Sequence, residues 1–340
     1  MRVLLVGNFF SSANAHGVGE DLATRLASMG WSVLRTSREP RKLPRLVDMV
    51  STAWQRRRDY DVAHVSVYSG AAFLWAEAVC ETLRVARKPY VLTLHGGNLP
   101  TFAARWPRRV RRLLRHASAV TAPSRYLLEG LRAHHDDAQL IPNPVELSDF
   151  GFRLRAQPEP SLLWLRAFHP LYAPTIAPEV VAHLAASEPN VRLRMVGPET
   201  ALDATDATRA TITRLALHDR VSLGGKIARA DVAGVMDGSD IFLNTSTVDN
   251  TPLSILEAMA CGLPVVTTGV GGIPYLLRDG HDALLVPAND AQAMADAVRR
   301  VLHEPGLAAR LSRNARETVE HFGWQHVLPQ WDALFRRVAA

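Results

Sequence analysis

The chain has few of the features that mark secreted, metal-binding or membrane-spanning proteins. Its 340 residues contain two cysteines, Cys80 and Cys261, which argues against a disulfide framework and a cysteine metal site. No stretch reaches the roughly 18 to 20 uncharged apolar residues of a membrane span. The start, MRVLLVGNFF, resembles a first strand and not a signal peptide, because its apolar part is short and no small-residue cleavage site follows. We therefore expect a cytoplasmic protein.

Motifs of metal and dinucleotide chemistry are also missing. There is no HExxH and no set of His and Cys residues at ligand spacing, so we expect no metal. Gly17 and Gly19 precede a helical pattern, but Thr24 and Arg25 occupy the region where a nicotinamide-binding fingerprint has its third glycine. The two glycines form a turn, or they let backbone amides approach a phosphate or sugar of a bound donor.

Positive charge is concentrated in the N-terminal half. Residues 1–155 contain 23 Lys and Arg against 13 Asp and Glu, whereas the remainder contains 16 against 20. The basic residues cluster in 35–45, 56–58 and 105–115. Such a surface attracts anionic partners. Two interpretations fit: a solvated arginine-rich surface, or peripheral contact with an anionic membrane or lipid-linked acceptor. No nucleic-acid-binding module is recognised, so we expect no nucleic acid.

Short apolar segments of strand length alternate with helical patterns, which predicts parallel sheets with crossover helices. The expected strands form two series: 3–6, 32–34, 62–67, 90–94, 119–121 and 139–141, then 162–165, 192–196, 221–223, 241–243, 265–267 and 283–286. Between the series, residues 144–160 are rich in proline and polar residues and are interpreted as a linker. We expect two doubly wound α/β domains that face a cleft, with ligands outside the carboxyl ends of the strands.

Residues 244–286 of the second series carry two carboxylates, Asp249 and Glu257, around the expected start of a helix. One interpretation is a buried βαβ unit. The other is a site for an anionic, sugar-bearing ligand. A glutamate in so apolar a helix is costly to bury unless it is paired or bound to a ligand, which favours the second interpretation.

The start of that helix is predicted to bind phosphate. Thr251 is expected to cap it and Pro252 to lie in its first turn. The next backbone amides, with the positive end of the helix dipole, favour an anion. The residues assigned to donor binding in this stretch are Asn250, Thr251, Pro252, Leu253, Ser254 and Glu257.

Gly271 and Gly272 follow a β-branched run and precede Ile273-Pro274, where a strand-to-helix turn needs a positive φ or close backbone approach. With EAMACGLPVV and the two carboxylates eight positions apart, this GGIP run resembles the donor-site signature of retaining glycosyltransferase family 4. The family's first glutamate is Asp249 here. Tyr275 stands where the family usually has a glutamate after GGIP.

The resemblance implies a GT-B fold with two Rossmann-like domains and a C-terminal helix that crosses back to the first. The corresponding ranges are 1–150 for an acceptor domain, 151–322 for a donor domain and 323–340 for the helix, whose sequence has one apolar face. The implied reaction is retaining transfer from a nucleotide-diphosphate sugar, with no cofactor beyond that donor substrate. Asp249 would contact the sugar hydroxyls and Glu257 the ribose.

Two further residues at strand ends are assigned to catalysis together with Asp249. His95, in TLHGG, resembles the family's histidine near the transferred sugar, the alternative being a structural histidine bonded to a loop. His64 is expected to be structural. Arg166 follows strand 162–165, and its forked donors suit a diphosphate leaving group.

The family's lysine, five residues after this arginine, is replaced by Leu171. Either His169 or Lys226 compensates, or the helix amides hold the phosphates. Lys226, in SLGGKI, matches the family's segment near the nucleotide base and is assigned to donor binding.

The leading hypothesis is a retaining glycosyltransferase with a glycan, lipid-linked or small-molecule acceptor. The alternatives are a nucleotide-sugar epimerase or hydrolase, and a sugar-nucleotide-binding protein that has lost catalysis. A membrane contact would be peripheral, at the inner face. The sequence pattern does not distinguish UDP, GDP, ADP or TDP, the sugar, the acceptor or the oligomeric state.

Overall fold

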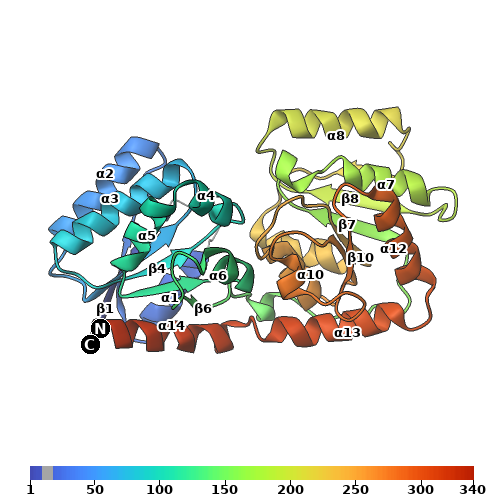
Figure 1. Ribbon diagram of the computed structural model, residues 1–340. Coiled ribbons are helices and arrows are strands. Elements are labelled where there is room, and N and C mark those ends of the chain that lie inside the picture. Colours follow the sequence, from blue (N-terminus) through green and yellow to red (C-terminus); the bar gives the residue numbers. More distant parts are fainter. Residues whose placement is uncertain (10–17) are drawn as a thin grey trace. The chain divides into compact units, whose positions relative to one another are not determined.

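The computed structural model describes residues 1–9 and 18–340 (Figure 1). These residues form two compact units, one of Met1–Pro144 with Trp324–Ala340 and the other of Val145–Gly323. Each unit contains a six-stranded parallel sheet with helices on both faces, which confirms the predicted doubly wound α/β architecture. Every segment predicted as a strand overlaps a strand of one of these sheets.

The sheet of the first unit has the strand order β2-β1-β3-β4-β5-β6. Alternate residues of each strand face opposite layers. Leu4 and Val6 therefore join the apolar core beneath the helices of residues 42–131, whereas Val3 and Leu5 join the core beneath helices Val18–Ser28 and Trp324–Ala339. The strands are β1 Arg2–Val6, β2 Ser32–Thr36, β3 Val62–Val67, β4 Tyr90–Leu94, β5 Ala119–Ala122 and β6 Gln139–Leu140.

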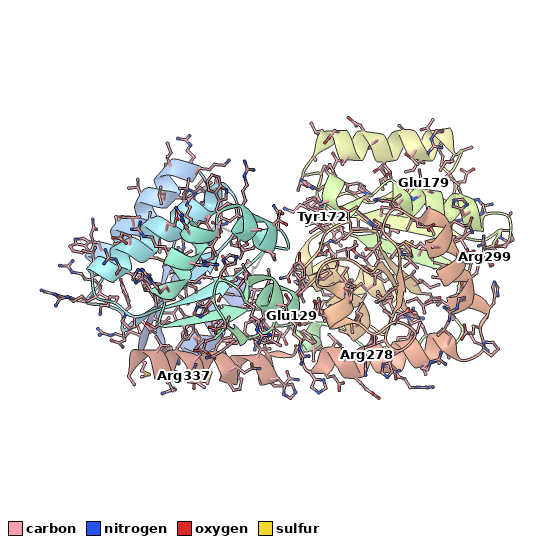
Figure 2. All side chains as sticks on the ribbon, viewed as in Figure 1. Glu129, Tyr172, Glu179, Arg278, Arg299 and Arg337 are labelled. Atoms are coloured by element: carbon pink, nitrogen blue, oxygen red, sulfur yellow. The ribbon has the colours of Figure 1, made fainter. Side chains whose placement is uncertain are left out.

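The helices of the first unit connect these strands, and the C-terminal helix packs on the same unit. Its apolar side, which includes Trp324, Val327 and Trp331, is buried with α1 and the sheet, and Arg337 (labelled in Figure 2) donates to Gln139 at 3.0 Å. The helices are α1 Val18–Ser28, α2 Lys42–Gln55, α3 Ala71–Val85, α4 Leu99–Arg105, α5 Pro107–Arg115, α6 Arg125–Leu131 and α14 Trp324–Ala339.

The sheet of the second unit has the order β12-β11-β10-β7-β8-β9. Leu162 and Trp164 point into the core formed with helices Ile176–Leu184 and Ala291–His303. Leu163 points into the core formed with helices Val232–Asp237, Leu253–Ala260 and Leu307–Glu320. The strands are β7 Ser161–Leu165, β8 Arg192–Val196, β9 Val221–Leu223, β10 Ile241–Asn244, β11 Val265–Thr268 and β12 Leu284–Val286.

Helices and short 3-10 turns complete the second unit. The α-helices are α7 Ile176–Leu184, α8 Leu202–Arg214, α9 Val232–Asp237, α10 Leu253–Ala260, α11 Ile273–Leu276, α12 Ala291–His303 and α13 Leu307–Glu320. The 3-10 turns are η1 Leu147–Asp149, η2 Pro170–Tyr172 and η3 Arg229–Asp231. None of the helices in the described ranges has the length and apolar character needed to cross a membrane.

The division after Pro144 falls before the predicted boundary at residue 150. Val145 donates its backbone N–H to the carbonyl of Phe322 at 2.9 Å, and Phe150 is buried in the core of the second unit. These contacts tie the first part of the predicted linker to the second unit.

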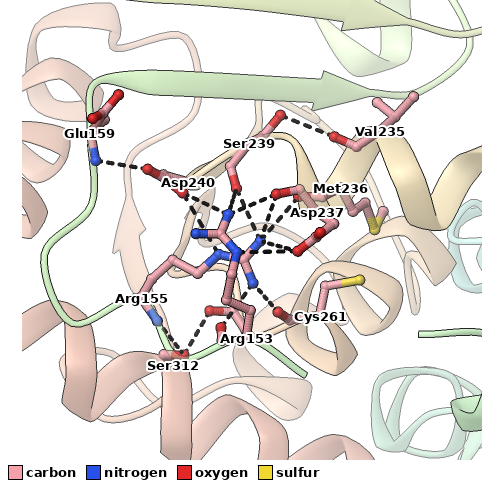
Figure 3. Close-up of polar contacts among 11 residues, drawn as sticks. Arg153, Arg155, Glu159, Val235, Met236, Asp237, Ser239, Asp240, Cys261 and Ser312 are labelled. Carbon is pink, nitrogen blue, oxygen red and sulfur yellow. Dashed lines mark hydrogen bonds and ion pairs between the residues drawn. The ribbon is translucent and has the colours of Figure 1, made fainter. Parts of the chain in front are cut away.

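A buried arginine holds the rest of the predicted linker to the second unit (Figure 3). The side chain of Arg155 is fully buried, and its guanidinium donates to the carbonyls of Arg153, Cys261, Met236, Asp237 and Ser239. Its Nε lies 3.8 Å from the Asp240 carboxylate, which also accepts from the N–H of Glu159 at 2.8 Å. The proline-rich segment is therefore an ordered part of this unit.

Candidate functional site

Two charged side chains meet at the carboxyl edge of the second sheet. Arg166 follows β7, and Asp249 lies in the loop that follows β10, the strand paired with β7. The Arg166 Nη2 and Asp249 Oδ2 atoms are 2.5 Å apart, and both side chains are largely buried. The structure thus joins, in one ion pair, the residues predicted to contact the diphosphate and the sugar.

Polar neighbours fix the Asp249 carboxylate. Its Oδ2 also accepts from the Ser246 hydroxyl at 3.0 Å, and its Oδ1 accepts from the backbone N–H of Asn250 at 2.9 Å. Ser246 in turn lies 2.9 Å from Asn244 Oδ1. The sequence pattern did not predict a role for Ser246, because its hydroxyl reaches Asp249 only in the folded loop.

Arg166 is held in place from its other side by an aromatic ring. Its guanidinium carbon lies 4.0 Å from the centroid of Tyr172 (labelled in Figure 2), which suits a cation–π contact. The Arg166 Nε atom is buried and has no hydrogen-bond partner among the described residues. A buried donor without a partner costs about 1 to 3 kcal/mol, so an acceptor at this point would be stabilising.

The start of α10 differs from the prediction. The helix begins at Leu253, and Pro252, with an extended backbone, is its N-cap residue. No side chain caps the helix, so the prediction that Thr251 caps it and that Pro252 lies in its first turn is wrong. The first amides of a helix have no intrahelical acceptor. The Ser254 hydroxyl beside them is buried and also lacks a partner among the described residues.

Glu257, in the middle of α10, is paired with an arginine that sequence reasoning missed. Its side chain is 3% exposed, and Arg229 of η3 forms an ion pair with its Oε1 atom. Burial raises the pKa of Glu257, and the positive charge of Arg229 acts in the opposite direction. Arg229 also lies over the ring of Phe150, 5.4 Å from its centroid. In the sequence, the feature that could have pointed to Arg229 is its position three residues after Lys226.

The glycine pair has the close contact that the sequence predicted. A Cβ on Gly271, which has φ +55°, would lie 2.1 Å from the carbonyl oxygen of Asp249, and one on Gly272 would lie 2.0 Å from that of Asn250. The N–H of Gly272 donates to the Asp249 carbonyl at 2.9 Å. The glycine turn therefore presses against the loop that carries Asp249 and fixes its backbone.

In the part of the chain that the structure describes, no hydrogen bond or ion pair joins Arg166 or Asp249 to Lys226, His169 or Leu171, the positions relevant to the missing lysine. Lys226 is exposed in the loop after β9. His169 accepts from the Leu171 N–H through Nδ1 at 3.2 Å, and Leu171 is exposed. The Leu171 carbonyl accepts from the N–H of Thr247 at 2.8 Å, which connects η2 to the loop after β10. Tyr275, in α11, is also exposed.

The residues predicted in the first unit have different surroundings. His95 follows β4, and its ring stacks on Tyr68 with centroids 4.9 Å apart. Burial lowers the pKa of His95 to about 4, so the ring is neutral at neutral pH. His64 is buried and lies 2.6 Å from the Thr93 hydroxyl, a structural setting. Gly19 lies in the first turn of α1, whereas Gly17 is outside the described residues.

No group of three or more His, Cys, Asp or Glu side chains in residues 1–9 and 18–340 is placed to hold a metal ion. The sequence does contain an Asp-x-Asp spacing, Asp59-Tyr60-Asp61. Both carboxylates have arginine partners: Arg56 pairs with Asp59, and Arg2 pairs with Asp61 at 2.6 Å.

Comparisons with known proteins cover both units. The model of Glycosyl transferases group 1 matches residues 152–318, and that of Glycosyltransferase Family 4 matches residues 13–149. Together the two models match most of both units, and the chain belongs to glycosyltransferase family 4. Its two Rossmann-like domains define the GT-B class of fold.

Individual relatives agree with this assignment. D-inositol 3-phosphate glycosyltransferase of Streptomyces bingchenggensis is 32% identical over 168 residues, covering 48% of this chain and 37% of that protein. The protein of the same name from Arthrobacter sp. is 26% identical over 359 residues, covering 93% and 85%. The chain spans about two fifths of the length of several relatives that it matches.

Solved structures share the fold at low sequence identity. Sucrose-phosphate synthase from Thermosynechococcus elongatus has a TM-score of 0.82 and 21% identity, with 99% of this chain and 98% of that one covered. Anabaena HepE, in complex with UDP-glucose, has a TM-score of 0.78 and 20% identity, with 99% and 100% covered.

Proposed function

We propose that this chain is a retaining glycosyltransferase that moves a sugar from a nucleotide-diphosphate sugar to an acceptor hydroxyl without a metal ion. The observation that carries the proposal is the Arg166–Asp249 ion pair at the carboxyl edge of the second sheet. It is supported by the adjoining start of α10 and by Glu257 on the same helix. Ligands of doubly wound domains bind at such an edge.

Each group has a chemical role in this reaction. Asp249 accepts hydrogen bonds from the sugar hydroxyls, and Glu257 accepts from the ribose. Arg166 and the first amides of α10 stabilise the negative charge that develops on the departing diphosphate. The buried Nε of Arg166 and the Ser254 hydroxyl, neither of which has a partner among the described residues, are the donors available to an anionic ligand.

Retention requires the acceptor oxygen to bond the anomeric carbon on the face from which the diphosphate leaves. The bond between that carbon and the phosphate oxygen breaks, and the departing phosphate accepts the proton of the acceptor hydroxyl. His95, neutral because of its lowered pKa, would hydrogen-bond to the transferred sugar without adding charge. Gly19 and Lys226 remain proposed donor contacts.

Partners and location follow the same proposal. The acceptor is a sugar or a glycolipid, bound by the first unit, and the protein is cytoplasmic with a peripheral contact at the inner face of a membrane. Anabaena HepE forms a complex with UDP-glucose, so UDP is the first nucleotide to test. A thermal-shift screen with UDP, GDP, ADP and TDP identifies the donor, because a ligand that binds only the folded state raises its stability.

Asp249→Ala and Glu257→Ala, each assayed with the identified donor and an acceptor panel, test the reaction itself. We expect both to lower transfer by roughly 100-fold or more, as for the loss of a group that stabilises a transition state. Unchanged transfer in both variants would overturn the proposal. Donor turnover without acceptor would instead identify an epimerase or hydrolase. Nucleotide binding without turnover would identify a protein that has lost catalysis. The exposed Leu171, which replaces the family's lysine, would fit that outcome.

A further inference from the structure

The outer surface of α2 in the first unit exposes an apolar stripe. Leu43, Val47, Val50 and Trp54 recur at helical spacing, and Leu43, Val47 and Trp54 are 76%, 66% and 43% exposed. The opposite side of the helix, with Met49, is already buried on the sheet. The helix therefore has one apolar side for the core and a second that faces solvent.

The stripe borders an apolar groove between α2 and α3, which lie side by side over the first sheet (Figure 1). The groove has a volume of about 620 Å³. Its walls include Leu46, Val47, Val50 and Trp54 from α2 and the exposed Val85 from α3. Solvent-exposed apolar surfaces of this kind mark contact sites for a partner or a membrane.

A second hollow, of about 590 Å³, lies between α3 and α5. It shares Ala78 and Glu81 of α3 with the groove, so the two hollows adjoin across that helix. Arginines dominate its polar lining: Arg84, Arg108, Arg109 and Arg112.

Two of these arginines are exposed and can bind an external anion. Glu81 pairs with Arg84 at 2.5 Å, and Glu77 pairs with Arg109. Arg108 and Arg112 form no ion pair with any residue that the structure describes, although the charge of Arg112 also helps to lower the pKa of Glu81. Exposed guanidinium groups bind phosphate oxygens through forked hydrogen bonds.

Further cationic groups surround the apolar stripe. Arg57 places its guanidinium 4.5 Å from the ring centroid of Trp54, and the exposed Arg58 follows it, whereas the neighbouring Arg56 is paired with Asp59. Lys42 lies at the other end of α2 and is also exposed. An apolar stripe bordered by Trp and basic residues is the pattern of helices that lie in a membrane interface.

We propose that the outer face of α2, α3 and α5 docks on an anionic lipid bilayer. Leu43, Val47 and Trp54 enter the boundary between headgroups and acyl chains, while Arg108 and Arg112 bind lipid phosphates. Charge complementarity favours this partner. An apolar stripe alone could contact many kinds of surface, but the exposed arginines beside the stripe favour a surface that carries both phosphates and apolar chains. The inference deepens the proposed membrane contact, and it does not depend on sugar transfer.

Vesicle flotation tests the docking directly. The full chain is mixed with vesicles of phosphatidylglycerol and phosphatidylcholine in equal parts, and separately with vesicles of phosphatidylcholine alone. We expect binding to the anionic vesicles, and we expect it to weaken at about 0.5 M salt because surface charges are then screened. No binding to the anionic vesicles, or equal and salt-independent binding to both, would overturn the proposal.

Matched variants separate the two parts of the face. Val47→Asp removes a buried apolar contact from the bound state and should weaken binding about tenfold or more. Arg108→Gln with Arg112→Gln should weaken it on the order of tenfold, since each cation near an anionic surface contributes. Leu202→Asp, at a 71% exposed position of α8 in the second unit, should bind like the wild type.

Two further measurements keep the result interpretable. Thermal unfolding of each variant shows whether the fold is intact, which we expect because the substituted side chains are exposed. Light scattering gives the oligomeric state. If the wild type is a dimer that Val47→Asp makes monomeric, the face is an interface between copies and the bilayer proposal is wrong. Activity with a soluble acceptor should be unchanged in Val47→Asp, so failure of docking is distinguishable from failure of the proposed function.

Discussion

Three arginines of the second unit and two of the first unit lie in opposite environments. In the second unit, Arg155, Arg166 and Arg229 each lie against a carboxylate, and the side chain of Arg155 is fully buried. In the first unit, Arg108 and Arg112 are exposed and form no ion pair with a described residue. The paired arginines therefore stabilise the fold of the second unit, whereas Arg108 and Arg112 of the first unit can bind an external anion.

The physical difference is the surrounding medium. A charge that is removed from water must be paired and hydrogen-bonded, or the fold is strongly destabilised. A charge in water has only a small effect on stability, because solvent and salt screen it. Substitution of a buried, paired arginine of the second unit should thus change stability or the reaction, whereas substitution of Arg108 or Arg112 should change mainly interactions with other molecules.

The largest effect is expected for Arg155→Met. It leaves several carbonyls and Asp240 without their buried donor, so the free energy of unfolding of the second unit should fall by about 3 to 5 kcal/mol. Urea unfolding of the full chain measures this loss. Arg153→Met, at a half-exposed side chain in the same network, is the control and should lose about 1 kcal/mol or less. Equal losses would show that burial does not distinguish the two arginines.

The next effect is expected on the reaction. Arg166→Met removes the cation that holds Asp249 and that, in the proposed reaction, stabilises the departing diphosphate, so kcat/KM for transfer should fall about 100- to 1,000-fold. Steady-state kinetics with the identified donor measures it. Lys226→Met, at the exposed position, should change kcat/KM by less than about tenfold. A loss as large as that of Arg166→Met would identify Lys226 as the replacement for the missing lysine.

A smaller effect is expected from the glycine turn that supports the Asp249 loop. Gly272→Ala places a Cβ against the Asn250 carbonyl although φ, at −82°, suits alanine, so the cost is steric. We expect a loss of about 1 to 3 kcal/mol in the free energy of unfolding. In Gly269→Ala the nearest atom is 3.8 Å away, and stability should stay within about 0.5 kcal/mol. Thermal melts of both variants decide whether the close approach matters.

The smallest effect is a shift in pH dependence. Burial raises the pKa of Glu257 above its unfolded value, so its contribution to stability is fully present below the unfolded pKa and is lost as the pH rises through the folded pKa. Arg229→Met removes the opposing charge and should raise that pKa further. The acid limb of donor binding, followed by calorimetry, should then move to higher pH. Arg229→Lys should restore it, and an unchanged limb in Arg229→Met would contradict the role given to this ion pair.

Much of the fold was predictable from local pattern. The apolar runs that became β3 and β4 were predicted with their observed bounds, because a strand buried on both faces has a nearly continuous apolar sequence. The strand-end positions of His95, after β4, and Arg166, after β7, followed from such runs. The role of Gly271 and Gly272 was also predictable, because two glycines at a strand-to-helix turn indicate a positive φ or a close backbone approach.

Local pattern failed where contacts between distant residues decide. Thr251 has the side chain of a good N-cap, but the helix begins later, at Leu253, and Pro252 takes the cap position. Arg45 belongs to a basic run that was predicted to be a charged surface, yet it is buried and donates to the Glu39 and Pro40 carbonyls. Neither outcome is encoded in residue spacing alone.

The sequence by itself determined the family, the doubly wound architecture and the identity of the two carboxylates, because these depend on periodicity and on a contiguous motif. Only the tertiary structure decided which cations meet them. Arg166 lies 83 positions from Asp249, and Arg229 lies 28 from Glu257. The first pair forms because the neighbouring parallel strands β7 and β10 bring their carboxyl ends to one edge of the sheet. The second joins η3 to the middle of α10, and both pairs exist only once the second unit is assembled.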